Sequence, residues 1–116
     1  MKLLHTREEE FTCSTVRHPA IIELKTGVKK DGTLVAREAR YTLNMGAYVA
    51  TGDFIVQWAG VSFSGVYKTP HLKFTGLSVY TNCPVGGSFR GFGNPQITFA
   101  VESQMDMIAE KLGIDP

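Results

Sequence analysis

The sequence has few of the residues on which metal sites and export signals depend. Its two cysteines, Cys13 and Cys83, lie far apart and form no CxxC pair, and its three histidines show no metal-ligand spacing. No apolar run reaches the length of an export signal or the roughly 20 residues that cross a bilayer. We therefore expect no metal ligands and no membrane partner. Isolated thiols indicate a reducing compartment, the cytoplasm, with a disulfide as the alternative.

The sequence also lacks an excess of charge of either sign. It has 12 basic and 11 acidic residues, which give a formal net charge of +1. Nucleic-acid binding requires a basic field that pairs with phosphates, so no nucleic-acid partner is expected. The hydrophobic share of 43% is ordinary for a globular protein. A length of 116 residues suits one domain, or a fragment of a larger one, of marginal stability.

The N-terminal half predicts a short helix and then a β-hairpin. Thr6 is a typical N-cap residue, and the carboxylates after it suit the positive end of a helix dipole. Residues 22–28 alternate apolar and polar side chains with the period of a strand. Asp31 and Gly32 predict a two-residue turn because both tolerate positive φ. The returning strand carries Val35, Ala39, Tyr41 and Leu43 on one face.

The C-terminal half predicts a strand and a long helix. Residues 73–82 alternate, with Leu77 and Val79 facing away from Phe74 and Tyr80. A long helix is predicted with Asn94 as its N-cap, Pro95 at its first position and Gly113 at its end, since apolar residues recur every three or four positions between them.

Residues 51–67 are ambiguous, because two glycines disfavour the helix whose apolar face would be Phe54, Ile55, Trp58, Val61 and Phe63. Together the elements predict an α+β fold with antiparallel strands and a long C-terminal helix, without a regular β-α-β alternation.

Residues 86–96 differ from a segment that serves only to pack the fold. Glycines surround Phe89, Arg90 and Phe92, and the start of a helix follows. Glycine allows close approach of the backbone to a ligand, a helix N-terminus attracts anions, and arginine donates to phosphate or oxo groups. These features favour an anionic ligand with a ring that phenylalanine can stack on. The alternative is an ordinary loop anchored by its phenylalanines. The spacing fits neither a dinucleotide fingerprint nor a P-loop.

The order of several short motifs resembles one enzyme family along nearly the whole chain. Residues 88–96 are similar to a loop of the molybdenum-binding subunits of xanthine dehydrogenases and aldehyde oxidases. Each other motif is weak alone, but their order and spacing together are specific. They are residues 6–11, 17–20, 31–34, 44–48, 80–82 and 112–116.

The resemblance implies a larger enzyme in which a molybdenum–pterin cofactor hydroxylates an aromatic heterocycle or an aldehyde with oxygen from water. Electrons would then leave through iron–sulfur clusters, and often FAD, on partner subunits or domains. Phe89, Arg90 and Gly91 would contact the cofactor, and Phe92 would contact the substrate. For Phe92 the alternative is a buried anchor of the loop.

Two departures from the family's pattern restrict the substrate. Trp58 stands where purine-oxidising members carry a substrate-binding arginine, which argues against xanthine and makes Trp58 a candidate substrate contact. Carbon monoxide-oxidising relatives hold copper on a cysteine of the loop. Gly91 and Phe92 occupy that region here, and Cys83 lies too far upstream, so this subtype is not expected.

No segment resembles the family's motif with the glutamate base, so no catalytic residue is expected in this chain. Glu102 and Glu110 are interpreted as solvated charges of the last helix. Residues 1–116 would be a single domain or a fragment of a molybdopterin-binding domain that begins and stops at the edges of elements and is inactive alone.

Its expected partners are the remainder of the molybdenum subunit, the iron–sulfur and flavin subunits or domains, and a small-molecule substrate. Apolar surface exposed on a fragment would favour self-association. The alternative function is a non-catalytic structural or interaction domain that keeps only the fold.

Overall fold

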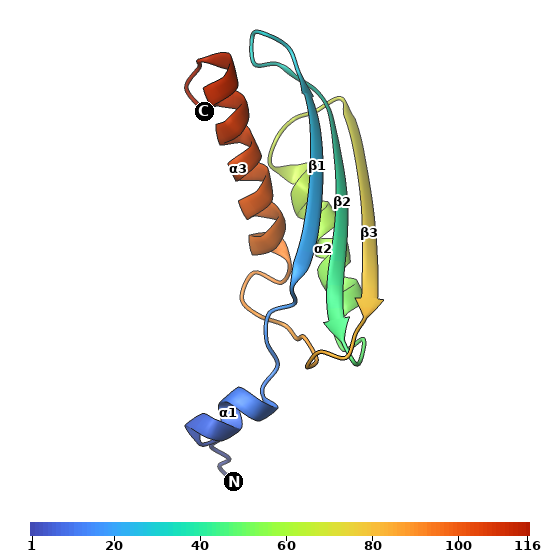
Figure 1. Cartoon of the computed structure of the whole chain (residues 1–116), viewed down its shortest axis with the longest axis vertical. Coiled ribbons are helices and arrows are strands. Elements are labelled where there is room, and N and C mark those ends of the chain that lie inside the picture. Colours follow the sequence, from blue (N-terminus) through green and yellow to red (C-terminus); the bar gives the residue numbers. More distant parts are fainter.

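The sheet is organised around Tyr41, which pairs with Ile22 on one side and Gly76 on the other. In the computed structural model, which describes residues 1–116, β2 (Leu34–Gly46) is the central strand between β1 (Ala20–Val28) and β3 (His71–Tyr80). Two helices, α2 (Gly52–Gly65) and α3 (Asn94–Leu112), cover one face of this sheet (Figure 1). The α+β class and the long C-terminal helix are therefore confirmed.

The third strand differs from the expected pattern. β1 and β2 pair antiparallel, but β2 and β3 pair parallel. A parallel pair needs a crossover of a dozen or more residues, and residues 47–70, which contain α2, supply it. The antiparallel pairing that the sequence predicts therefore holds for β1 and β2, and β3 adds a parallel pair through one crossover, which makes the sheet mixed. The sequence did not predict this crossover because the helical pattern of residues 51–67 was ambiguous.

The turn between β1 and β2 is longer than predicted. The Gly32 amide donates to the Lys29 carbonyl at 3.0 Å, and the Lys29 amide donates to the Thr33 carbonyl at 2.9 Å. Only Gly32 has a positive φ, of 84°. The Asp31 carboxylate instead accepts from the Thr33 amide at 2.9 Å, and this contact lowers the pKa of that carboxyl. Aspartate therefore stabilises the turn through its side chain.

The inner face of β2 forms the centre of the core. The alternating pattern placed four apolar residues on this face. Ala39, Tyr41 and Leu43 are buried there, whereas Val35 is 38% exposed. The core continues through α2 and α3 with Met45, Ile55, Ala59, Phe63, Ile97 and Val101. This packing fixes both helices against the sheet.

The buried face of α2 is rotated from the predicted one. Ile55 and Phe63 are buried as expected, but Phe54, Trp58 and Val61 are 61%, 52% and 58% exposed. Gly60, which disfavoured a helix in the sequence, faces the Phe74 ring, and a Cβ there would lie 3.0 Å from that ring. The glycine thus lets α2 approach β3 closely.

α3 matches its prediction at the C-terminal end, whereas at the other end the N-cap is Gly93, and the predicted cap Asn94 is the first helical residue, followed by Pro95. At the C-terminal end, the capping residue Gly113 has a φ of 69°, and its amide and the Ile114 amide close the last turn on the carbonyls of Glu110 and Ala109. This is the glycine-terminated geometry that the sequence indicated. Its buried residues are Ile97, Val101 and Ala109.

The N-terminal residues form an arm that projects from this body (Figure 1). α1 (Arg7–Cys13) begins at Thr6, whose hydroxyl accepts from the Glu9 amide while the Glu9 carboxylate accepts from the Thr6 amide. No residue of α1 is buried. The arm extends the molecule to 59 × 25 × 25 Å.

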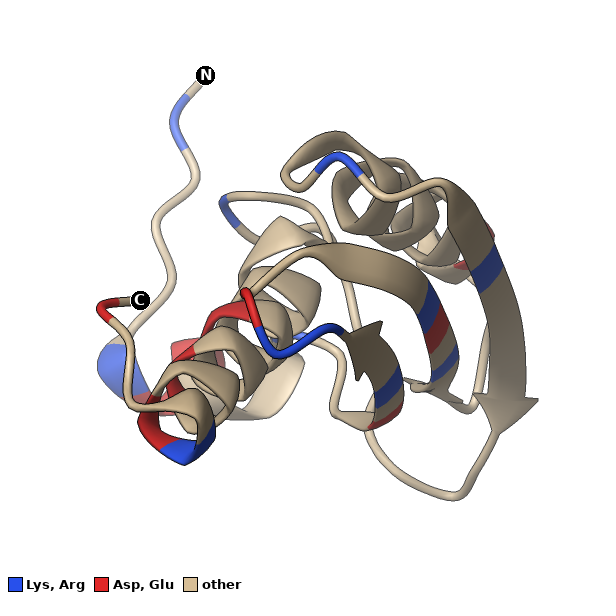
Figure 2. Ribbon diagram, turned by 90° about the horizontal axis from the view of Figure 1, so that it is seen from above, with Lys and Arg blue, Asp and Glu red and all other residues tan.

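Basic and acidic residues are interspersed along the strands of the sheet (Figure 2). Lys73 pairs with Glu38 at 2.8 Å, and Arg40 approaches Glu23 at 4.0 Å. Exposed pairs of this kind add little stability. None of the helices has the length and apolar character needed to cross a membrane.

Candidate functional site

The loop between β3 and α3 ends in consecutive left-handed residues. Gly91, Phe92 and Gly93 have φ values of 90°, 47° and 95°. The Phe92 amide donates to the Phe89 carbonyl, and the Asn94 amide donates to the Gly91 carbonyl, each at 2.9 Å. A phenylalanine rarely adopts positive φ, and such strain is concentrated at functional sites. We call residues 88–92 the loop tip.

The base of the loop is packed against the segment that precedes β1. The Gly87 amide donates to the Val16 carbonyl at 2.9 Å, and the Gly86 amide donates to the Met45 carbonyl at 3.2 Å. A Cβ at Gly86 would collide with the His18 ring, and one at Gly87 would collide with Thr15. These glycines are therefore required by close packing.

His18 is a buried residue of the segment that precedes β1. It is only 2% exposed, and its Nδ1 lies 2.9 Å from the Asn44 carbonyl oxygen. Its Nε2 is buried without a partner. The ring forms the floor beneath Gly86.

The loop tip presents donors without acceptors. The main-chain amides of Ser88, Phe89, Arg90 and Gly91 donate to no acceptor within the chain. Arg90 is exposed and belongs to none of the ion pairs. Unpaired amides beside a guanidinium can bind oxo or phosphate oxygens.

The tip is held by a residue that the sequence did not point to as part of the site. Arg17 donates from Nη2 to the Arg90 carbonyl at 2.7 Å and from Nη1 to Gln96 Oε1 at 3.3 Å. Its guanidinium lies 4.7 Å from the centroid of the Phe89 ring. Arg17 and Gln96 are separated by 79 positions, so no local pattern links them. The one signal that could have found Arg17 was the resemblance of both segments to a single family.

The predicted substrate residues lie at different depths. Phe92 is half-buried and packs against the hydrophobic core. α2 reaches the loop near its N-terminus, where Ser88 donates to Thr51 at 3.2 Å and Gly93 packs against Ile55. Trp58 lies about one helical turn beyond Ile55 and is 52% exposed. Phe89, Arg90, Gly91 and Phe92 therefore lie together in the loop, whereas Trp58 belongs to the neighbouring helix α2.

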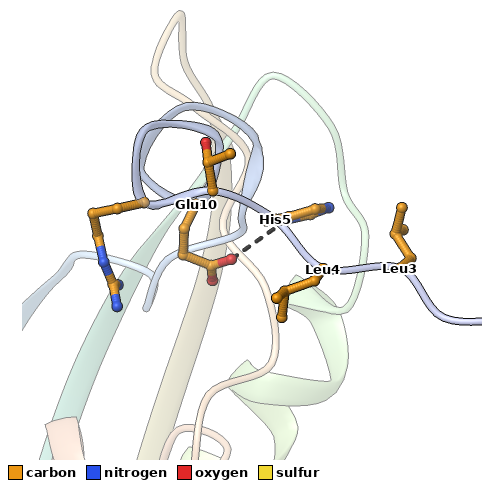
Figure 3. Close-up of a pocket in the computed structure, with 6 residues that line it drawn as sticks. Leu3, Leu4, His5 and Glu10 are labelled. Atoms are coloured by element: carbon orange, nitrogen blue, oxygen red, sulfur yellow. Dashed lines mark ion pairs between the residues drawn. The ribbon is translucent and has the colours of Figure 1, made fainter.

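The largest hollow of the molecule lies at the arm. It measures about 710 Å³ and is lined by residues of the arm, among them Leu3, Leu4 and His5. Figure 3 shows His5 beside Glu10, with Nδ1 3.3 Å from the carboxylate. All of its lining residues are exposed, and none belongs to the loop. This hollow is therefore separate from the candidate site.

Known proteins are similar to this chain in sequence and in fold. Residues 1–116 match the molybdopterin cofactor-binding domain family. The chain is 39% identical to a probable xanthine dehydrogenase subunit of Bacillus subtilis over all of its length and 16% of that protein. It is 40% identical to the nicotinate dehydrogenase large molybdopterin subunit of Eubacterium barkeri, again over its full length and 27% of that protein.

Solved structures agree with these relatives. The aldehyde oxidoreductase from Desulfovibrio gigas is 44% identical and superposes with a TM-score of 0.80 over 86% of this chain and 11% of that chain. The enzyme from Desulfovibrio desulfuricans is 32% identical, with a TM-score of 0.82 over the same shares. The chain spans 16% and 27% of the two sequence relatives named above. It belongs to the molybdopterin cofactor-binding domain family.

Proposed function

We propose that this chain supplies one wall of the cofactor and substrate site of a molybdenum hydroxylase related to xanthine dehydrogenases and aldehyde oxidoreductases. The family assignment and the donor-rich loop tip support this function. When bound, the molybdenum–pterin group supplies the oxidising centre for hydroxylation with oxygen from water. The residues of this chain position that group and the substrate.

The loop tip fits an anionic, oxygen-rich cofactor. The unpaired amides of residues 88–91 and the exposed Arg90 guanidinium are donors without internal acceptors. Neither Arg90 nor Arg17 belongs to any of the ion pairs of the chain, so both cations favour an anion. Phe89, Arg90 and Gly91 would hold the cofactor, with Arg90 as its main side-chain donor.

Phe92 and Trp58 are the proposed substrate contacts. Phe92 packs against the core and is half-buried, so the exposed part of its ring would be available to a substrate. Trp58 offers an apolar surface in place of a cation, which favours an aromatic heterocycle or an aldehyde over xanthine. Relatives are named for xanthine, nicotinate and aldehyde oxidation.

The chain by itself would be inactive, because it supplies no general base. Glu102 is exposed on α3 and accepts from the Tyr67 hydroxyl at 2.8 Å, and this contact raises the pKa of Tyr67. Glu110 is exposed on the same helix. The remainder of the molybdenum subunit would supply the base, while iron–sulfur and flavin partners accept electrons. Exposed free thiols at Cys13 and Cys83 support a cytoplasmic location.

The observation that carries the proposal is the donor set at the loop tip, and Arg90→Ala in the full-length parent protein tests it. We expect loss of molybdenum and pterin on the order of tenfold, with an unchanged midpoint of thermal unfolding when the cofactor-free proteins are compared. Arg40→Ala, on the outer face of the sheet, is the matched control. Full molybdenum content in the Arg90→Ala protein would contradict the assigned role. A parent protein that holds no molybdenum would favour the structural or interaction domain instead.

A further inference from the structure

We propose that Arg17 is a positioning residue for the loop tip, holding its amides and Arg90 in the arrangement that receives the cofactor. This inference rests on the proposed function and assigns a specific role to a residue outside the loop. Arg17 lies in the segment between α1 and β1, and its side chain contacts the tip at the Arg90 carbonyl.

The contacts of Arg17 converge on different parts of the tip. Nη2 reaches the Arg90 carbonyl at 2.7 Å, and the guanidinium carbon lies 4.7 Å from the centroid of the Phe89 ring. Nη1 reaches Gln96 at 3.3 Å in the first turns of α3. One side chain therefore connects the tip to the helix that follows it. A planar guanidinium can make all of these contacts at once, whereas an ammonium cannot.

Few other contacts hold the tip. Ser88 donates to Thr51 at 3.2 Å, and the Phe92 amide closes a turn on Phe89. The glycine packing against Thr15 and His18 fixes the base of the loop but not the tip. The orientation of the exposed Arg90 backbone thus depends mainly on Arg17.

The bond to the Arg90 carbonyl has a further consequence for the free donors. Because a guanidinium only donates hydrogen bonds, Arg17 holds the tip through the Arg90 carbonyl and leaves the amides of the tip unoccupied. The cofactor would then meet donors that are already ordered, and ordering them would cost less on binding. Gln96 supports the arrangement, since its Nε2 also donates to the His18 carbonyl at 3.3 Å.

The test uses the full-length parent protein with Arg17→Ala and Arg17→Lys, with Arg40→Ala as control and Arg90→Ala as reference. Both Arg17 variants should lose molybdenum and pterin on the order of tenfold. In hydrogen exchange, the Phe92 and Asn94 amides should lose protection while the amides of β2 and of α3 beyond its first turn keep theirs. Gln96→Ala should show a smaller loss of both, because the Arg90 contact remains.

The outcomes separate this inference from the proposed function. If Arg90→Ala loses molybdenum and both Arg17 variants do not, the positioning role fails and the proposed function stands. If neither Arg90→Ala nor Arg17→Ala loses molybdenum, the proposed function fails as well. Arg17→Lys with wild-type content and protection would show that charge alone suffices, which overturns the geometric role. Should Arg17→Ala fail to fold, Arg17→Lys and Gln96→Ala decide the question.

Discussion

Arg37 and Phe63 are joined twice, since the buried guanidinium donates to the Phe63 carbonyl at 2.7 Å and lies 4.7 Å from the centroid of its ring. Arg37 also donates to the Tyr67 carbonyl at 3.2 Å and to the Thr69 hydroxyl at 3.1 Å. It is 2% exposed, and this burial lowers its pKa. A cation at the C-terminus of α2 satisfies carbonyls that the helix leaves free.

Replacement of Arg37 should therefore destabilise the end of α2. We expect Arg37→Ala to lower the free energy of unfolding by about 3 kcal/mol, because it leaves buried carbonyls unpaired and opens a cavity. Arg37→Met should cost less, since it keeps the volume. Urea unfolding of the parent protein measures both, with exposed Arg40→Ala as control. A loss of under about 0.5 kcal/mol for Arg37→Ala, the range of ordinary surface substitutions, would refute the role.

Tyr41 is buried at the centre of the sheet, and its hydroxyl has no hydrogen-bond partner. Tyr41→Phe removes a buried polar atom without removing its ring. We expect stability to be unchanged or raised by up to about 1 kcal/mol, measured by urea unfolding. A destabilisation beyond about 1 kcal/mol would mean that the hydroxyl has a partner in solution.

The same residue predicts sensitivity to alkali. Burial raises the pKa of Tyr41 from 10.0 to about 12. Because the pKa of Tyr41 is higher in the folded than in the unfolded chain, the stability that its neutral form contributes is fully present below pH 10. That stability is lost as the pH rises toward 12, since the unfolded chain ionises first. Stability should therefore fall over that interval, and it should fall less steeply in Tyr41→Phe. Unfolding midpoints across the interval check this, and equal slopes would contradict the shift.

Gly93 is required by both its backbone and its surroundings. Its φ is 95°, and a Cβ would lie 2.6 Å from the Ile55 carbonyl oxygen. We expect Gly93→Ala to destabilise the parent protein by about 2 kcal/mol or more, since left-handed strain and the collision add. Gly65→Ala is the matched control, because a Cβ there has nothing within 4 Å. Equal thermal midpoints for the two variants would show that the loop relaxes at no cost.

Exposed apolar side chains predict self-association of residues 1–116 when separated from the parent. Phe54, Trp58 and Val61 form an exposed stripe on α2, while Leu3 and Leu4 are exposed on the arm. Contiguous patches of this kind favour association. Light scattering should give a mass above the 12.7 kDa of one chain, and Phe54→Ser with Trp58→Ser should reduce it. A monomer at high concentration would contradict this expectation.

Local sequence patterns were sufficient to predict the helices and strands that have clear capping residues or a regular apolar period. The Thr6 and Gly113 caps, the alternation in β1 and β2, and the apolar period of α3 depend on contacts within a few residues, so the sequence alone determined them. Resemblance in the order of the motifs determined the family. It also indicated Phe89, Arg90, Gly91 and Phe92, which lie next to each other in the chain, as the candidate site residues.

Only the tertiary structure decided which distant residues meet. The parallel pairing of β3 follows from the α2 crossover, and the rotation of α2 that exposes Trp58 follows from packing of Phe74 on Gly60. The contact of Arg17 with the loop tip spans 73 positions. The period of apolar residues and the helix or strand propensity of each residue describe neighbours along the chain. These contacts are instead set by close packing of segments that meet only after folding.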